Sequence, residues 1–184
     1  MNSPSAKADL KTLAAALADG DLTLEPLEER HLATLKAACA EDPDIWEIMP
    51  LSMLGDHFAP AIAARRAVPG VIFAVVQAGA VIGITSYLRP DPERGVVEIG
   101  GTYIVPRARS TGVNGRMKRL MIQSAFASGF SRIEFRIDER HVRSQAAVLK
   151  LGARREALIE AERITWTGHV RNTCLFGLTQ EDWI

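Results

Sequence analysis

The segment from residue 96 to residue 129 constrains the fold most. Residues 96–105 form a β-branched and apolar run typical of a buried strand, and Pro106 ends it. A short turn follows, and apolar residues then recur at helical spacing up to Gly129: Val113, Met117, Leu120 and Met121. The chain therefore passes from a strand, through a tight turn, into an amphipathic helix.

The turn at residues 107–114 predicts an anion site. Unpaired backbone N–H groups and the positive end of the helix dipole meet where a helix follows a strand. Gly112 permits close approach of the backbone to a phosphate oxygen. Three guanidinium groups can add charge-assisted contacts: Arg107, Arg109 and Arg116. A pyrophosphate suits this turn, and the alternative is a solvated turn with a glycine for its conformation.

The remaining pattern predicts an α+β (mixed α/β) fold. Strands are predicted at residues 22–24, 71–77, 80–88, 132–138, 157–164 and 170–178. Helices are predicted at residues 28–40, 113–129 and 143–151, with interrupted helical fragments at 45–49 and 52–66. Residues 1–20 are expected to be an N-terminal extension, either a short helix or a loosely held tail. Residues 21–184 then form one domain.

Composition narrows the class of protein. A chain of 184 residues that is 47% hydrophobic fits one domain with a sizeable core. The 22 basic and 22 acidic residues balance, which argues against a nucleic-acid partner. Cys39 and Cys174 lack metal-ligand spacing and are expected to be buried thiols, with no metal site. Neither a signal peptide nor a membrane span is indicated, so a cytoplasmic protein is expected.

Two segments together carry a family resemblance. After the turn with Asn114 and Lys118, residues 138–145 and the pair Leu151-Gly152 follow in order. This set resembles the GNAT acetyltransferases, especially the branch of ribosomal-protein N-terminal acetyltransferases. There an R/Q-x-x-G-x-G/A turn precedes a segment close to N-x-R-S-x-x-A, matched here by Arg143-Ser144-Gln145-Ala146-Ala147. The resemblance covers residues 21–184 and includes the terminal Glu181-Asp182-Trp183.

The resemblance implies a GNAT-like fold, with a central, mostly antiparallel twisted sheet of about seven strands flanked by helices. It also implies that acetyl-CoA is the co-substrate and that its pyrophosphate binds the turn. The implied cofactor-binding residues are Tyr103, Val105, Arg107, Arg109, Thr111, Gly112, Val113, Asn114 and His141. His141 stands where the family usually has an asparagine that contacts the pantetheine arm. The alternative for His141 is a loop residue that faces water.

Acetyl transfer to an amine requires a neutral nitrogen, a donor for the carbonyl oxygen and a proton for the leaving thiolate. By resemblance, strand 96–105 splays from its neighbour and frees backbone groups around Tyr103 to Val105. Ser144 is expected to protonate the thiolate, or to be a helix N-cap. Glu98 is expected on one strand face with Gly100, Thr102 and Ile104, as the base or as a solvent-facing residue.

The expected activity is N-acetylation of a primary amine, on a protein N-terminus or a small molecule, by a monomer or homodimer. The acceptor side is expected to be an apolar cleft of Trp46, Met49, Phe58 and the loop around Trp166. The alternative is a catalytically weak acyl-CoA-binding sensor or partner protein. A doubly wound nucleotide-binding domain is disfavoured, because the glycine turn follows the fourth strand and no GxGxxG occurs.

Overall fold

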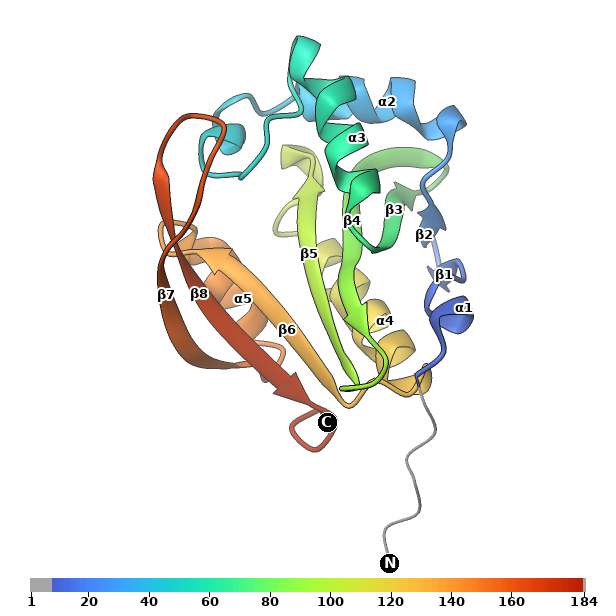
Figure 1. Ribbon diagram of the computed structural model, residues 1–184. Coiled ribbons are helices and arrows are strands. Elements are labelled where there is room, and N and C mark those ends of the chain that lie inside the picture. The colour runs from blue at the N-terminus through green and yellow to red at the C-terminus, as the bar shows by residue number, and fades with distance from the viewer. Residues whose placement is uncertain (1–7, 184) are drawn as a thin grey trace, which may run out of the picture.

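Eight strands form one twisted sheet in the computed structural model, which describes residues 8–183 (Figure 1). Their order across the sheet is β1-β2-β3-β4-β5-β6-β8-β7. The strands are β1 Leu17–Asp19, β2 Leu22–Pro26, β3 Gly70–Gln77, β4 Ala80–Asp91, β5 Val96–Ile104, β6 Arg132–Asp138, β7 Arg154–Ile164 and β8 Val170–Thr179. Each neighbouring pair is antiparallel except β5 and β6, which α4 connects in parallel.

Helices cover both faces of the sheet. They are α1 Leu10–Leu13, α2 Glu29–Cys39, α3 Phe58–Ala67, α4 Val113–Ala127 and α5 Val142–Leu149, with 3-10 turns η1 Asp44–Glu47, η2 Gly55–His57 and η3 Pro106–Ala108. In Figure 1, α4 lies behind β5, and α3 lies in front of the upper part of the sheet. Pro60 is compatible with α3 because it falls in the first turn, where its missing N–H is not needed.

The buried face of α4 fixes the parallel crossover against the sheet. Its core side chains follow the helical repeat: Val113, Met117, Met121, Ile122 and Ala125. Burial of each large apolar side chain contributes roughly 1.5–3 kcal/mol. The hydroxyl of Tyr87 on β4 donates to the backbone oxygen of Met121 at 2.5 Å, which ties the sheet to the helix.

Strand β5 separates from β6 halfway along its length. The parallel ladder contains only the pairs Val96↔Arg132, Val97↔Ile133 and Glu98↔Glu134. Beyond Glu98, β5 stays paired with β4 alone, up to Gly83↔Ile104. A V-shaped gap in the ladder, which we call the β5–β6 gap, therefore opens toward the start of α4 (Figure 1).

The sheet confirms the expected fold class and contains eight strands rather than about seven. The added strand is β1, which pairs with β2 at the edge of the sheet. Residues 8–20, expected to be a short helix or a loose tail, contain α1 and pack against the rest of the chain. Leu13 is fully buried, and the N–H of Asp9 donates to the backbone oxygen of Ser128 at 2.7 Å. Residues 1–7 of that predicted extension lie outside the described part of the chain.

Candidate active site

The turn before α4 has the geometry expected of an anion site. Gly112 is the N-cap of α4 with φ +90°, a conformation that favours glycine. A Cβ built on Gly112 meets no atom within 4 Å, so the backbone there is open to a ligand. The first helical bond is donated by Arg116 to the backbone oxygen of Gly112 at 3.0 Å. The N–H groups of Val113, Asn114 and Gly115 precede that bond and therefore point out of the helix end.

The arginines of the turn have acidic partners within the protein. Arg107 pairs with Glu41, and Arg109 pairs with Asp42. Arg109 also donates from Nε to the backbone oxygen of Ile104 at 2.8 Å. These contacts fix the turn against the loop after α2. An anion at the turn is therefore held first by backbone N–H groups, and Arg107 reaches it only by leaving Glu41.

Two further members of the predicted set are held by internal contacts. Arg116 pairs with Asp19 at 2.8 Å and Asp21 at 2.9 Å, on the side of β1 and β2. The hydroxyl of Thr111 donates to the backbone oxygen of Ala108 at 2.8 Å. Both contacts shape the turn, so neither side chain is free to reach a phosphate without losing a bond.

The expectation that Val105 offers free backbone groups is wrong. Its N–H donates to Ile82 O at 2.9 Å, and its oxygen accepts from Ala108 N at 3.1 Å. Backbone groups alternate between the two edges of a strand, so those of Tyr103 point toward β4 as well. The intervening residue, Ile104, directs its N–H toward the β5–β6 gap. Of the backbone groups expected to be free around Tyr103 to Val105, only the N–H of Ile104 therefore faces the gap.

The side chain of Tyr103 belongs to the core. Its hydroxyl donates to Ala38 O at 2.8 Å, and its ring centroid lies 4.8 Å from that of Trp46. Burial holds the pKa of the Tyr103 hydroxyl above its ordinary value. Tyr103 therefore positions β5 against α2 and is poorly suited to proton transfer.

A bulge in β5 places Glu98 on a different face from Thr102 and Ile104, contrary to the expected alternation. Two residues separate Gly100 from Tyr103, opposite the single residue between Ser86 and Ile84 on β4. Gly101 occupies the bulge with φ +60°. Glu98 therefore faces away from α4, whereas the hydroxyl of Thr102 accepts from Lys118 of α4 at 2.7 Å.

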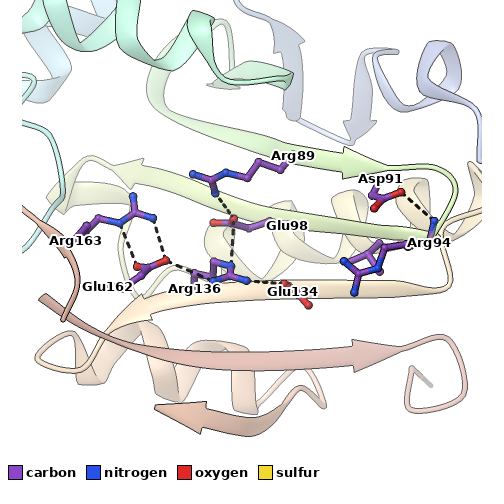
Figure 2. Close-up of a pocket in the computed structure, with 9 residues that line it drawn as sticks. Arg89, Asp91, Arg94, Glu98, Glu134, Arg136, Glu162 and Arg163 are labelled. Atoms are coloured by element: carbon purple, nitrogen blue, oxygen red, sulfur yellow. Dashed lines mark hydrogen bonds and ion pairs between the residues drawn. The ribbon is translucent and has the colours of Figure 1, made fainter. Parts of the chain in front are cut away.

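Glu98 lies at the base of the β5–β6 gap and is 8% exposed. Its Oε2 lies 2.9 Å from Arg89 Nη1 and 3.8 Å from Arg136 Nε (Figure 2). Burial raises the pKa of Glu98 above its usual value, and the neighbouring guanidinium groups offset part of that rise. A Cβ on Gly100 would meet Oε1 at 3.0 Å, so the glycine leaves this carboxylate its space.

Glu98 is part of a charged cleft of about 580 Å³ on the face away from α4 (Figure 2). The cleft is lined by Arg89, Asp91, Arg94, Val96, Glu98, Glu134, Arg136, Glu162 and Arg163. Sequence reasoning found only Glu98 among them. Arg89 and Ala161 have φ of +46° and +48°, at irregularities in β4 and β7 that turn the neighbouring side chains into the cleft. No glycine marks either position in the sequence.

The expected apolar wall of the acceptor site is mostly core. Trp46, Met49 and Phe58 are 0%, 8% and 5% exposed and belong to the hydrophobic core. Trp166 is 41% exposed, and its indole N–H donates to Trp46 O at 2.6 Å. The ring of Trp166 lies 5.3 Å from that of His57. Only the Trp166 end of the predicted wall is therefore available to a ligand, and the cleft beside it is charged.

Ser144 and His141 both lie at the start of α5. His141 is the N-cap, and Ser144 is the third helical residue, so the N-cap interpretation of Ser144 is wrong. The N–H of Ser144 donates to His141 O at 3.0 Å. His141 is half-buried rather than facing water. Burial first, and Arg143 next, hold the pKa of His141 below its ordinary value, so its imidazole is neutral at neutral pH.

Lys118 is the one lysine on the buried face of α4. It is 6% exposed, and its Nζ donates to Thr102, whose hydroxyl lies 2.8 Å from that of Thr85. Burial lowers the pKa of Lys118 to about 7. The hydrogen bond from Lys118 to Thr102 holds the β5 bulge to α4, and the sequence alone did not indicate that contact.

Lys118→Met is expected to stabilise the protein at neutral pH. The unfolded chain binds a proton at Lys118 up to an ordinary pKa of 10.5, whereas the folded chain releases it above about 7. The free energy of unfolding of the unsubstituted protein therefore decreases as the pH falls from 10.5 to 7. The decrease is up to about 1.4 kcal/mol for each pH unit, because folding has to remove the proton from Lys118. Urea unfolding across this pH range should show that the free energy of unfolding rises less with pH in the variant than in the unsubstituted protein. Parallel curves for the two proteins would contradict a neutral Lys118.

Other predicted features concern metals, thiols and membranes. Within residues 8–183, no three His, Cys, Asp or Glu side chains gather as a metal site. Cys39 and Cys174 are free and buried, as predicted. None of the helices in this part of the chain has the length and apolar character needed to cross a membrane.

The profile of the acetyltransferase (GNAT) domain matches residues 21–154. A probable acetyltransferase of the GNAT family from Chromobacterium violaceum is 25% identical, with a TM-score of 0.89. That alignment covers 100% of this chain and 94% of the other. No curated protein sequence matches.

Two more distant structures share the fold. The microcin C7 self-immunity acetyltransferase MccE, in complex with acetyl-CoA and AMP, is 14% identical with a TM-score of 0.77, over 88% of this chain and 93% of that one. The ribosomal-protein-S5-alanine acetyltransferase from Vibrio fischeri is 14% identical with a TM-score of 0.71, over 92% of this chain and 99% of the other.

Proposed function

The chain belongs to the GNAT acetyltransferase family, and from this premise we propose that it transfers an acetyl group from acetyl-CoA directly to a primary amine. One observation carries the proposal. The β5–β6 gap begins at Glu98 and opens toward the Gly112 turn of α4. With its pyrophosphate at the turn, acetyl-CoA would place its thioester in the gap, where an amine in the charged cleft could reach it on the side of Glu98.

The residues present fit acetyl-CoA. The open backbone at Gly112 and the N–H groups of Val113, Asn114 and Gly115 suit a pyrophosphate. Arg107 is 55% exposed at its side chain and can add a contact if it exchanges Glu41 for a phosphate. His141 lies at the mouth of the gap and can hydrogen-bond a pantetheine amide through either ring nitrogen.

Acetyl-CoA, when bound, supplies a thioester carbonyl that a neutral amine can attack. In the transfer a C–N bond forms, the C–S bond breaks, the amine loses a proton and the thiolate gains one. Glu98 accepts the proton from the amine through intervening water, because several residues of β5 separate it from the N–H of Ile104. The N–H of Ile104 donates to the carbonyl oxygen as charge develops on it. Ser144 is the proposed proton donor to the sulfur.

The cleft favours an amine as the acceptor. Glu98 and Glu134 line the cleft, and an ammonium group can bind their carboxylates by replacing part of their contacts with Arg89 and Arg136. An α-amine, with a pKa near 8, is partly neutral already, so it demands less of Glu98 than a lysine amine does. We therefore propose an α-amine, of a small molecule or of a peptide.

The proposal is tested by measuring thiol release from acetyl-CoA with a panel of amines, and by detecting the acetylated amine by mass spectrometry. We expect amine-dependent thiol release that matches the amount of N-acetyl product. Tight acetyl-CoA binding without turnover on any amine or peptide would instead support an acyl-CoA-binding partner protein.

A further inference from the structure

Two arginines face each other directly across strands β7 and β8. Arg163 and Arg171 are register partners, and partners in an antiparallel pair point to the same face of a sheet. That face is the one with the charged cleft, because Arg163 lines the cleft and Thr173, two residues beyond Arg171, bonds Glu162 at 2.7 Å. Like charges directly opposite each other destabilise a sheet unless an anion lies between them.

Arg171 is buried and incompletely paired. It is 5% exposed, its Nη2 donates to Arg136 O at 3.1 Å, and its buried Nε lacks a partner among the described residues. Burial first, and Arg163 next, hold the pKa of Arg171 below its ordinary range. Removing an unpaired charge from water is costly, so such a site is stabilised by a bound anion.

The nearest carboxylates are committed elsewhere. Glu162 bonds Arg163 at 3.1 Å and Thr173 at 2.7 Å. Asp138 receives a two-pronged contact from Arg140, at 2.9 Å and 2.8 Å. Within residues 8–183 neither carboxylate forms an ion pair with Arg171. Glu162, Asp138 and Glu98 offset part of the fall in the pKa of Arg171, but none of them forms an ion pair with its guanidinium among the described residues.

A bulge in β7 creates this arrangement. Three residues separate Ile159 from Arg163, opposite the single residue between Thr173 and Arg171 on β8. Ala161 occupies the bulge with φ +48°, and Asn172 Oδ1 accepts its N–H at 2.9 Å. The bulge turns the neighbouring side chains, Glu162 and Arg163, toward Glu98 (Figure 2). Strained non-glycine residues of this kind gather at ligand sites.

We propose that Arg163 and Arg171 form a carboxylate subsite, so that the acceptor is a primary amine carrying a carboxylate. This inference rests on the proposed function. Glu98 attracts the ammonium end of such a molecule, and the arginine pair binds its other end. The carboxylate belongs either to a free α-amino acid or to an acidic first residue of a peptide, and the two sources share the same chemistry.

Matched acceptors test the subsite. We compare kcat/KM for α-amino acids with that for their amides, and for peptides that begin with Asp or Glu with that for peptides that begin with Asn or Gln. Amidation of an amino acid lowers the pKa of its amine and so raises the reactive fraction. A preference for the free carboxylate therefore opposes this chemical bias. A higher kcat/KM for amino acids than for their amides identifies a free amino acid as the acceptor. A higher kcat/KM for peptides that begin with Asp or Glu than for those that begin with Asn or Gln identifies an acidic peptide.

Variants assign the preference to the arginine pair. Arg163→Met and Arg171→Met should each reduce kcat/KM for the carboxylate acceptor roughly tenfold to hundredfold more than kcat/KM for its amide, the size of a hydrogen bond to a charged group. Arg155→Met, an exposed arginine on the same strand, is the control. Arg163 lies on the cleft rim, so its variant keeps the test valid if Arg171→Met does not fold. Equal kcat/KM for acids and amides, or loss in neither variant, would overturn the subsite.

A binding measurement separates this inference from the proposed function. With CoA present, calorimetry should show that the protein binds N-acetylated amino acids with higher affinity than the amides of the same N-acetylated amino acids. This difference is expected even if no amine is turned over. Absence of turnover together with carboxylate-selective binding would reject the acetyl transfer and keep the anion subsite. Turnover without carboxylate selectivity would keep the transfer and reject the subsite.

Discussion

Gly112→Leu should weaken acetyl-CoA binding by at least about hundredfold, measured by calorimetry. Glycine is the residue that adopts φ +90° without strain, and a non-glycine residue there costs about 1–3 kcal/mol or forces the turn to move. A leucine side chain would also fill the open space at this backbone. Loss of two charge-assisted hydrogen bonds to a pyrophosphate accounts for the expected loss in affinity.

Gly79→Leu is the matched control for this substitution. Gly79 lies in the β3–β4 turn with φ +81°, and a Cβ built on it also meets no atom within 4 Å. The two substitutions therefore impose a similar backbone strain at an open surface. Gly79→Leu should keep its affinity for acetyl-CoA, and unchanged affinity in Gly112→Leu as well would reject the turn as the pyrophosphate site.

Glu98→Gln should reduce kcat by about a hundredfold to ten-thousandfold, the usual contribution of a positioned general base. The amide keeps the size and the hydrogen-bonding capacity of the side chain but cannot accept the proton. The KM for acetyl-CoA should change little, because the proposed pyrophosphate site lies at the far end of the gap. Steady-state kinetics with saturating amine measures the change.

The pH profile supplies a second readout for Glu98. Its raised pKa means that the carboxylate becomes protonated, and activity falls, at a higher pH than for an ordinary glutamate as the solution is acidified. That acidic limb of kcat/KM should disappear in Glu98→Gln. Glu156→Gln is the control, because it removes a carboxylate of β7 that pairs with Arg132 of β6. An unchanged kcat in Glu98→Gln would contradict Glu98 as the base and would show that water or another group accepts the proton.

The sequence predicted the order of the elements because each has a clear period. The three-to-four spacing on α4 and the alternation on β6 match the observed helix and strand. Pro106 marked the C-terminal end of β5, because proline restricts the backbone angle and has no N–H to donate. Gly112 marked the start of α4, because glycine permits a positive φ. These boundaries depend on the residue at the position and not on tertiary contacts, so they can be predicted from the sequence.

The cleft escaped prediction because it depends on bulges. Alternation along β5 fails at Gly101, so Glu98 and Thr102 lie on different faces. The bulges at Arg89 and Ala161 contain no glycine that would have revealed a positive φ. Each bulge shifts side chains by one face, and only tertiary packing determines where that occurs.

The ion pairs of the α4 turn were equally hidden. Arg107 and Arg109 bind Glu41 and Asp42, which lie in a loop far earlier in the chain. A local motif shows that arginines surround a phosphate site, but not that acidic residues already hold them. The backbone of the turn, centred on Gly112, therefore carries more of the predicted pyrophosphate site than its arginines do.

The most direct test of the account is a crystal structure with CoA bound. We expect the pyrophosphate within hydrogen-bond distance of the N–H groups at residues 113–115, and the pantetheine between β5 and β6 with its sulfur in the gap between Ile104 and Glu98. CoA bound outside the gap, or a gap closed by pairing of Ile104 with β6, would contradict the proposed active site.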